Sequence, residues 1–224
     1  MVIRNKFTKV RTAKGRKKSS TTWLRRQLND PYVIKAKLEG YRSRAAYKLI
    51  EINDKFNILK KGKIVIDLGC APGGWCQVAI KIVGANNVLG VDILEMDEIS
   101  GVHFIQQDFL KPEADEIIIK SLKEDLGKNR KCDVVLSDMA GNSSGDSRTD
   151  HIRIIGALEE TLEFAKKILA KDGNFVGKVF QGGASGELLE IFKNNFTSVK
   201  HFKPKSSRQE SAENYIIGIG FKSL

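Results

Sequence analysis

A buried strand that runs directly into a glycine-rich turn is the feature that most constrains the fold of this chain. The apolar residues 64–66 are followed by Asp-Leu-Gly-Cys-Ala-Pro-Gly-Gly-Trp at residues 67–75. Apolar residues then recur at helical spacing, which predicts a helix over residues 73–83. Because glycine has no Cβ, such a turn allows the backbone to approach a ligand closely. The strand, turn and helix therefore predict a ligand-binding unit, although the usual dinucleotide fingerprint G-x-G-x-x-G is absent from the turn.

Strands and helices alternate along the rest of the chain. The sequence predicts strands over 64–67, 87–92, 102–106, 133–137, 175–180, 198–202 and 215–221. It predicts helices over 73–83, 113–126, 150–169 and 187–196, and a further helix that Ser43 caps. Such alternation with short links is typical of an α/β, Rossmann-like fold, a mostly parallel sheet with helices on both faces. Because no helix separates the last two predicted strands, one of them is expected to run antiparallel.

Positive charge is concentrated in the N-terminal part of the chain. Residues 1–63 hold 19 Lys and Arg against 4 acids, whereas residues 64–224 hold 19 against 23. A near-neutral body with a basic arm predicts a polyanionic partner, bound through salt-dependent phosphate contacts. A mitochondrial targeting peptide is the alternative, because such peptides are also Arg-rich and acid-free. The positive excess continues to Lys63, beyond any plausible cleavage point, which argues against that alternative.

The predicted domain organisation follows from this division. Residues 1–40 are expected to form a basic arm and residues 41–224 one α/β domain. Within the arm, residues 1–22 are predicted to be disordered without a partner, because they contain few apolar residues. Residues 23–38 are predicted to be helical around a break at Pro31.

Several classes of protein are disfavoured by the composition. No apolar run approaches the length of a membrane span, and no hydrophobic segment follows the basic start, which disfavours secretion. The three cysteines have no Cys-x-x-Cys spacing and the three histidines are scattered, so no metal site is expected. The cysteines are interpreted as small buried residues in a reducing compartment.

Acidic residues follow three successive predicted strands. Asp67 ends the first strand, Asp92 ends the second and Asp108 follows the third. Ligands of open α/β sheets bind at the carboxyl ends of strands, where Asp92 is placed to accept hydrogen bonds from ribose hydroxyls and Asp108 to meet an adenine edge. An acid beside the turn disfavours a pyrophosphate and suits a positively charged sulfonium. The three acids therefore predict S-adenosyl-L-methionine as the cofactor.

Two further charged residues stand near the same edge of the predicted sheet. Asp138 follows the fourth strand, and Lys178 lies among the apolar residues of the fifth. A charge within an apolar strand is costly unless it is paired or functional. A buried Lys178–Asp138 pair with a purely structural role is the alternative to a reactive lysine. Lys48 and Glu213, taken alone, would be interpreted as solvated.

The chain resembles the bacterial heat-shock FtsJ/RrmJ family of ribosomal RNA large-subunit uridine-2′-O-methyltransferases. The resemblance rests on residues 42–49, 67–75, 92–97, 137–145, 178–182 and 203–215, and covers nearly the whole chain from about residue 41. The Lys-Asp-Lys-Glu constellation of that family corresponds to Lys48, Asp138, Lys178 and Glu213. The Ser-x-Glu-x-Tyr context selects Glu213 over Glu210 as its last member.

This resemblance implies a class I methyltransferase fold and a specific set of functional residues. The expected catalytic residues are Lys178, Asp138, Lys48 and Glu213, with Lys178 as the general base in its neutral form or as the group that steers the hydroxyl in its charged form. The resemblance maps the cofactor contacts to Gly73, Trp75, Asp92, Asp108 and Asp138. The glycine turn and the strand that precedes it add Asp67, Gly69, Pro72 and Gly74 to the expected cofactor-binding residues.

The expected activity is 2′-O-methylation of a uridine in 23S ribosomal RNA, within the large ribosomal subunit and late in its assembly. The resemblance further implies a cytoplasmic monomer without a metal ion or a membrane anchor. A transfer-RNA 2′-O-methyltransferase and a catalytically silent ribosome-assembly factor are the alternatives; a messenger-cap enzyme is disfavoured by the short chain. The chain departs from the family at Gly141, where a proline is usual, so a looser loop is expected there.

The expected RNA-binding surface combines the basic arm with cations of the body. Its cationic candidates outside the arm are Arg42, Arg44, Lys60, Lys61, Lys63, Lys203, Lys205 and Arg208. Four aromatic residues are interleaved with these charges, namely Trp23, Tyr32, Tyr41 and Tyr47. They are predicted either to stack on bases or to pack the arm onto the body.

Overall fold

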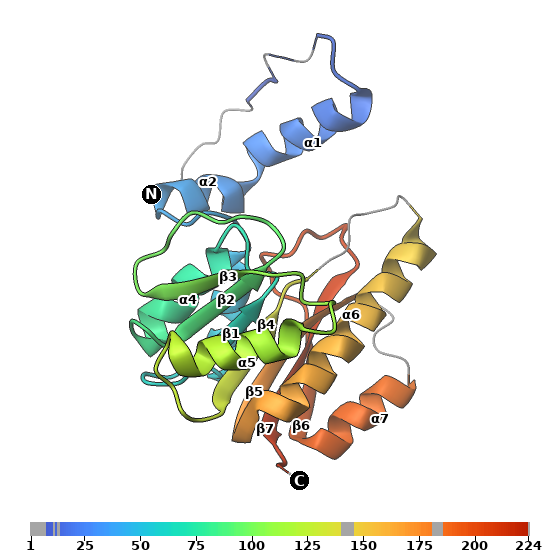
Figure 1. The fold of residues 1–224 in the computed structure, drawn as a ribbon. Coiled ribbons are helices and arrows are strands. Elements are labelled where there is room, and N and C mark those ends of the chain that lie inside the picture. The colour runs from blue at the N-terminus through green and yellow to red at the C-terminus, as the bar shows by residue number, and fades with distance from the viewer. Residues whose placement is uncertain (1–7, 11, 13, 140–145, 181–185, 224) are drawn as a thin grey trace.

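The computed structural model describes residues 8–10, 12, 14–139, 146–180 and 186–223 (Figure 1). Seven strands within these residues form a single sheet, namely β1 (Val65–Leu68), β2 (Val88–Asp92), β3 (Val102–Gln106), β4 (Cys132–Ser137), β5 (Leu169–Phe180), β6 (Phe196–Phe202) and β7 (Glu213–Phe221). Seven helices accompany them in the same described residues, namely α1 (Lys18–Asn29), α2 (Pro31–Leu38), α3 (Ala46–Phe56), α4 (Gly74–Val83), α5 (Ala114–Glu124), α6 (Ser147–Ile168) and α7 (Gly186–Asn195).

The strand order of the sheet is β3-β2-β1-β4-β5-β7-β6. The first five strands in this order pair in parallel, and β7 pairs antiparallel with both β5 and β6. This arrangement confirms the prediction of a mostly parallel sheet with one antiparallel strand near the C-terminus. The reversal arises because β6 and β7 are joined by a loop, whereas a parallel neighbour requires a longer crossover.

Helices cover both faces of the sheet, as predicted (Figure 1). On one face α3 and α4 bury their apolar sides, with Leu49 and Val78 among the buried residues. On the other face α5, α6 and α7 do the same, with Leu162 and Phe192 among them. The two layers leave the carboxyl ends of the parallel strands at one edge of the molecule, where ligands of such sheets bind.

The fifth strand is longer than predicted. β5 begins at Leu169 rather than at residue 175, and α6 ends one residue before it. Residues 170–174 include polar residues and a glycine, so this part of the strand lacks the apolar pattern that predicts a strand. Leu169 pairs with Cys132, with a register irregularity before Val134.

The N-terminal arm is more ordered than predicted in one segment. α1 begins at Lys18, so the prediction of disorder is wrong for residues 18–22, whereas residues 1–7, 11 and 13 lie outside the described part of the chain. Lys, Arg, Gln and Leu are good helix formers. The end of α1 is also anchored, because Asn29 accepts a hydrogen bond from the Thr8 backbone amide at 2.7 Å and donates one to the Thr8 carbonyl at 3.0 Å.

Tyr32 packs the arm onto the body through the ring of Tyr47, which also contacts Tyr41. The Tyr47 ring lies 5.4 Å from that of Tyr32 and 5.7 Å from that of Tyr41, centroid to centroid. The packing alternative therefore describes these three residues. Trp23 on α1 is different, because 55% of its surface is exposed.

The predicted cap of the third helix is wrong. α3 begins at Ala46 without a side-chain cap, and Ser43 lies against the start of α4 instead. A Cβ atom added to Gly74 would lie 2.3 Å from Ser43 Oγ, so these two residues are closely packed. Ser43 therefore packs against the glycine turn and does not cap α3.

Candidate active site

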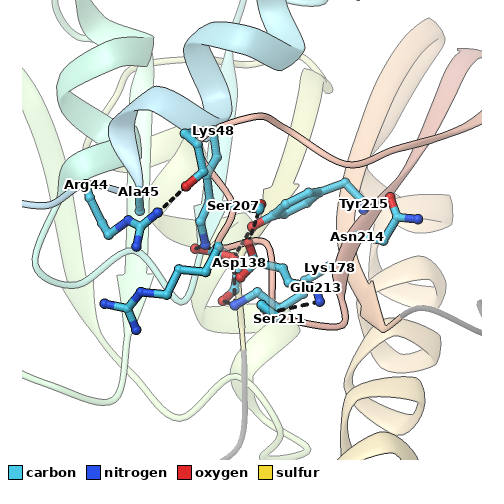
Figure 2. Close-up of polar contacts among 12 residues, drawn as sticks. Arg44, Ala45, Lys48, Asp138, Lys178, Ser207, Ser211, Glu213, Asn214 and Tyr215 are labelled. Carbon is cyan, nitrogen blue, oxygen red and sulfur yellow. Dashed lines mark hydrogen bonds and ion pairs between the residues drawn. The ribbon is translucent and has the colours of Figure 1, made fainter. Parts of the chain in front are cut away.

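Four charged side chains from distant parts of the chain converge at the carboxyl edge of the sheet (Figure 2). Lys48 comes from α3, Asp138 directly follows β4, Lys178 lies within β5 and Glu213 opens β7. The antiparallel register places Glu213 opposite Phe180 and Tyr215 opposite Lys178, which brings the last strand against the end of the fifth. The structure therefore brings together the four residues that the resemblance predicts to be catalytic.

Asp138 is the centre of this cluster. Its Oδ1 lies 2.7 Å from Lys178 Nζ, and its backbone carbonyl accepts a second hydrogen bond from the same Nζ at 2.7 Å. Its Oδ2 lies 3.5 Å from Lys48 Nζ. Lys48 Nζ in turn donates to Glu213 Oε2 at 2.7 Å. The four groups thus form one alternating chain of cations and carboxylates.

The cluster is largely removed from solvent. The side chains of Lys178, Lys48, Glu213 and Asp138 are only 9–16% exposed. Burial alone would raise the pKa of Asp138, but Lys178 and then Lys48 outweigh it and hold this pKa at about 2. Burial would likewise lower the pKa of Lys48, but the carboxylates of Asp138 and Glu213 outweigh it and raise this pKa. Asp138 and Lys48 are therefore charged at neutral pH.

Tyr215 is a member of the cluster that sequence reasoning missed. Its hydroxyl donates to Asp138 Oδ1 at 2.7 Å, and its ring lies 5.7 Å from that of Trp75. Burial raises the pKa of Tyr215 well above its ordinary value, so the hydroxyl remains a donor. The signal was present in the sequence, since residues two apart on a strand share a face and Tyr215 is two residues after Glu213.

A cleft of about 1,380 Å³ opens beside the cluster. Gly69, Asp92, Asp108 and Asp138 contribute to its wall from the ends of four parallel strands, and α6 contributes further lining residues, with Gly156 among them. Such a volume accommodates a ligand of nucleoside size or larger. Asp138 belongs both to the cleft and to the charged cluster, and so forms the junction between them.

The glycine turn shapes the wall of this cleft. Gly69 has φ +74°, and a Cβ atom there would lie 2.5 Å from the Met139 side chain. Asp92 holds the turn, since its two carboxylate oxygens accept hydrogen bonds from the Ala71 and Leu94 amides, each at 2.8 Å. Each oxygen retains a lone pair that can accept a further hydrogen bond. Asp92 therefore holds the turn and retains acceptor capacity beside the cleft.

The second half of the turn contacts the N-terminal segment and does not line the cleft. Arg42 donates to the carbonyls of Pro72 at 3.2 Å, Asp97 at 2.6 Å and Glu98 at 2.7 Å. Gly73 leaves room for this side chain, because an added Cβ would lie 3.3 Å from Arg42 Nη1 and closer still to neighbouring apolar groups.

Gly74 and Trp75 have similar surroundings. Gly74 packs against Ser43, and the indole of Trp75 donates to the Ala45 carbonyl at 2.8 Å. Trp75 is only 2% exposed. Pro72, Gly73, Gly74 and Trp75 thus have evident packing roles, and their contacts with a cofactor stay a prediction.

Asp67 is fully buried behind the turn. The Cys76 thiol donates to its Oδ2 at 3.2 Å, and its Oδ1 has no hydrogen-bond partner among the described residues. Burial raises the pKa of Asp67 to about 8. The carboxyl is therefore largely protonated in the folded protein at neutral pH, in contrast to Asp138.

The Asp67→Asn variant is expected to flatten the dependence of stability on pH. The wild-type carboxyl ionises near pH 4 in the unfolded chain but only near pH 8 in the folded protein, so its contribution to the free energy of unfolding falls as the pH rises from about 4 to about 8. Asparagine removes this titration. Urea unfolding at pH 5 and pH 8 measures it, with the exposed Asp54→Asn as control. An equal decline in the variant and the wild type would contradict the assignment.

Some predicted features lie outside the described residues. These include Gly141 with its expected loose loop, and the stretches 140–145 and 181–182 that contribute to the resemblance. Within the described ranges, no group of three or more metal-ligating side chains is found. The helices of these same ranges include none long and apolar enough to cross a membrane.

The fold and the site define an α/β enzyme of the Rossmann-like class, with a nucleoside-sized cleft that ends at a buried lysine–carboxylate cluster. The FtsJ-like methyltransferase family model matches residues 41–221, and the chain belongs to this family. Its members transfer a methyl group from a methyl donor.

Relatives of this chain extend over almost its whole length. It is 51% identical to the ribosomal RNA large subunit methyltransferase E of Rickettsia bellii and 48% identical to that of Rickettsia rickettsii, over 98% of this chain and 96% of each relative. A solved structure described as a ribosomal RNA methyltransferase from Plasmodium falciparum has a TM-score of 0.71 at 34% identity, covering 81% of this chain and 98% of that one.

Proposed function

We propose that this protein transfers a methyl group from S-adenosyl-L-methionine to the ribose 2′-hydroxyl of a uridine in 23S ribosomal RNA, within the large ribosomal subunit. The observation that carries the chemistry is the position of Asp138, which lines the cleft and contacts Lys178 at 2.7 Å. The substrate class is supported by the relatives, which are named ribosomal RNA large subunit methyltransferases at about half identity.

The residues present fit this cofactor. The carboxylates of Asp92 and Asp108 line the cleft and suit ribose hydroxyls and an adenine amine, and Gly69 contributes backbone without a side chain. Acidic lining also suits the positive charge of a sulfonium. When bound, S-adenosyl-L-methionine supplies an activated methyl group and a good leaving group.

The protein then has to align the ribose hydroxyl and assist the loss of its proton. Lys178 Nζ contacts Asp138 twice, and no third partner of Nζ is found among the described residues, so this N–H or lone pair can face the substrate hydroxyl. As a free amine, Lys178 would accept the hydroxyl proton; as an ammonium, it would stabilise the negative charge that develops on the oxygen. Asp138 orients Lys178, and the paired Lys48 and Glu213 would orient the ribose.

The basic arm supplies the RNA-binding surface in this proposal. Residues 1–40 form the arm and residues 41–224 the methyltransferase domain of a monomer that acts in the cytoplasm, where ribosomal subunits are assembled. The exposed Trp23 lies on α1 with exposed cations at Lys18, Arg25 and Arg26. A ring flanked by cations suits stacking on a base with contacts to phosphates.

Neutralisation of three arm cations is expected to weaken RNA binding. Replacing Lys18, Arg25 and Arg26 by Gln should lower affinity at least about tenfold and reduce the salt slope of log K by about 2. Filter binding between about 50 and about 200 mM salt measures both quantities. The matched control replaces Lys171, Lys193 and Lys200, which lie on β5, α7 and β6. Equal losses in the two triple variants would contradict a specific role for the arm.

The decisive test of the function uses radiolabelled S-adenosyl-L-methionine. Large subunits, free ribosomal RNA and transfer RNA are offered separately to the wild-type enzyme and to Lys178→Ala. Label on the ribose of large-subunit RNA that is lost in the variant supports the proposal. Label on transfer RNA alone would support the methyl-transfer chemistry but contradict ribosomal RNA as the substrate. Cofactor binding without transfer to any RNA would support a silent assembly factor.

A further inference from the structure

Asp30 joins the N-terminal arm to the body at a buried position between α1 and α2. It is only 8% exposed. Its Oδ1 caps α2 by accepting hydrogen bonds from the Tyr32 and Val33 amides at 3.0 and 3.4 Å. Its Oδ2 pairs with the guanidinium of Arg44 and lies 3.4 Å from Arg208 Nε. One carboxylate therefore holds the arm, the segment before α3 and the loop before β7.

The loop before β7 is held from two sides. Arg44 donates to the carbonyl of Ser206, and Glu51 of α3 accepts hydrogen bonds from the amides of Lys205 and Ser206, the latter at 3.0 Å. Ser206 is fully buried. These contacts fix the backbone immediately before Ser207.

Ser207 connects this loop to the catalytic cluster. Its hydroxyl donates to Glu213 Oε1 at 2.7 Å, while Glu213 Oε2 accepts from Lys48 Nζ at 2.7 Å (Figure 2). Ser207 is 5% exposed, so the bond is shielded from water. Glu213 is thus oriented from one side by the loop and from the other by Lys48.

We infer that Asp30 is a positioning residue for methyl transfer, which acts through Arg44, the loop at 204–208 and Ser207 on the Glu213–Lys48 pair. The inference rests on the proposed function. It also assigns new roles to two cations that the sequence placed on the RNA surface. Arg44 is 15% exposed and Arg208 27% exposed in their side chains, and both are paired with Asp30. Their charges hold the loop in place, and the free cations of α1 remain for RNA.

The test compares Asp30→Asn with the exposed Asp54→Asn, which removes the same charge from the surface of α3. Asparagine keeps an oxygen that can cap α2 but loses the charge that pairs with the two arginines. With ribosomal RNA as substrate, kcat of Asp30→Asn is expected to fall about tenfold or more, because small displacements of catalytic groups are costly. KM for RNA and the Kd for the cofactor are expected to stay within about twofold.

A double-mutant cycle with Ser207→Ala separates positioning from general stability. If Asp30 acts through Ser207, the double variant should be no slower than Ser207→Ala alone, whereas independent effects would multiply. Should Asp30→Asn not fold, Arg208→Gln enters the same cycle in its place. Asp30→Glu, which restores the charge, is expected to recover part of kcat.

Different results contradict the inference and the proposed function. Unchanged kcat in a folded Asp30→Asn, a loss confined to KM for RNA, or multiplicative effects in the cycle would each overturn the inference while leaving the proposed function intact. A wild-type enzyme without activity on ribosomal RNA would contradict the proposed function and, with it, the inference.

Discussion

Replacement of Lys178 by alanine is expected to lower methyl transfer about 10³-fold, the usual effect of removing a group that handles the proton in the transition state. Lys178 is the lysine that contacts Asp138 at the point where Asp138 also lines the cleft. Alanine removes the only Nζ that makes two hydrogen bonds to Asp138 among the described residues, and leaves the cleft lining unchanged. Cofactor affinity should therefore stay within about twofold.

The measurement is single-turnover transfer from labelled cofactor, with cofactor binding determined by calorimetry on the same samples. Lys171→Ala provides a matched control, since Lys171 lies on the same strand, β5, but is exposed to solvent. Turnover of Lys178→Ala at the level of this control would remove Lys178 from the chemistry. It would then favour the structural pair with Asp138 as the reason for the buried lysine.

The Asp138→Asn variant is expected to lose both activity and stability. Asp138 is the carboxylate that lies between Lys178 and Lys48, and its replacement leaves these two buried lysines with Glu213 as the remaining carboxylate of the cluster. Breaking such a buried arrangement on one side costs about 3 kcal/mol of the free energy of unfolding. Transfer should fall by at least about 10²-fold, because Lys178 loses the group that orients it.

Asp133→Asn is the matched control for this variant. Asp133 lies near the other end of β4 and also contacts two cations, Lys63 at 2.8 Å and Arg130 at 2.9 Å. Those cations are about half exposed, at 43% and 50%, so the loss should be only about 1 kcal/mol and activity should persist. Urea unfolding and the transfer assay measure the two effects. A smaller stability loss in Asp138→Asn than in Asp133→Asn would contradict the central role of Asp138.

The stability lost in the Asp138→Asn variant is expected to depend on pH. Because the pKa of Asp138 is held at about 2 in the folded protein, its contribution to stability is present above about pH 4 and disappears as the pH falls towards about 2. Asp67 has the opposite effect, since its raised pKa makes stability fall between about pH 4 and about pH 8. The two buried carboxyls should therefore be distinguishable from their single asparagine variants.

The sequence by itself determined the α/β architecture and the edge of the sheet at which the cleft lies. Alternating apolar strands and helices predict a parallel sheet, and parallel strands collect their carboxyl ends at one edge. Local patterns alone therefore predict that Asp92 and Asp108 lie at the same edge of the sheet. The first part of the helix at residues 18–29 was missed, because the arm has few apolar residues before Trp23 and local pattern therefore predicted disorder there.

The resemblance, and not local pattern, singled out Lys48 and Glu213, which read alone as solvated residues. Only the tertiary structure brings them within 2.7 Å across 165 positions of sequence. It does so because β7 runs antiparallel beside β5, a register decided by packing on both faces of the sheet. The same holds for Tyr215, Ser207 and Asp30, whose partners come from other elements. Local periodicity specifies which elements form, whereas the contacts between elements depend on how their faces and edges pack together.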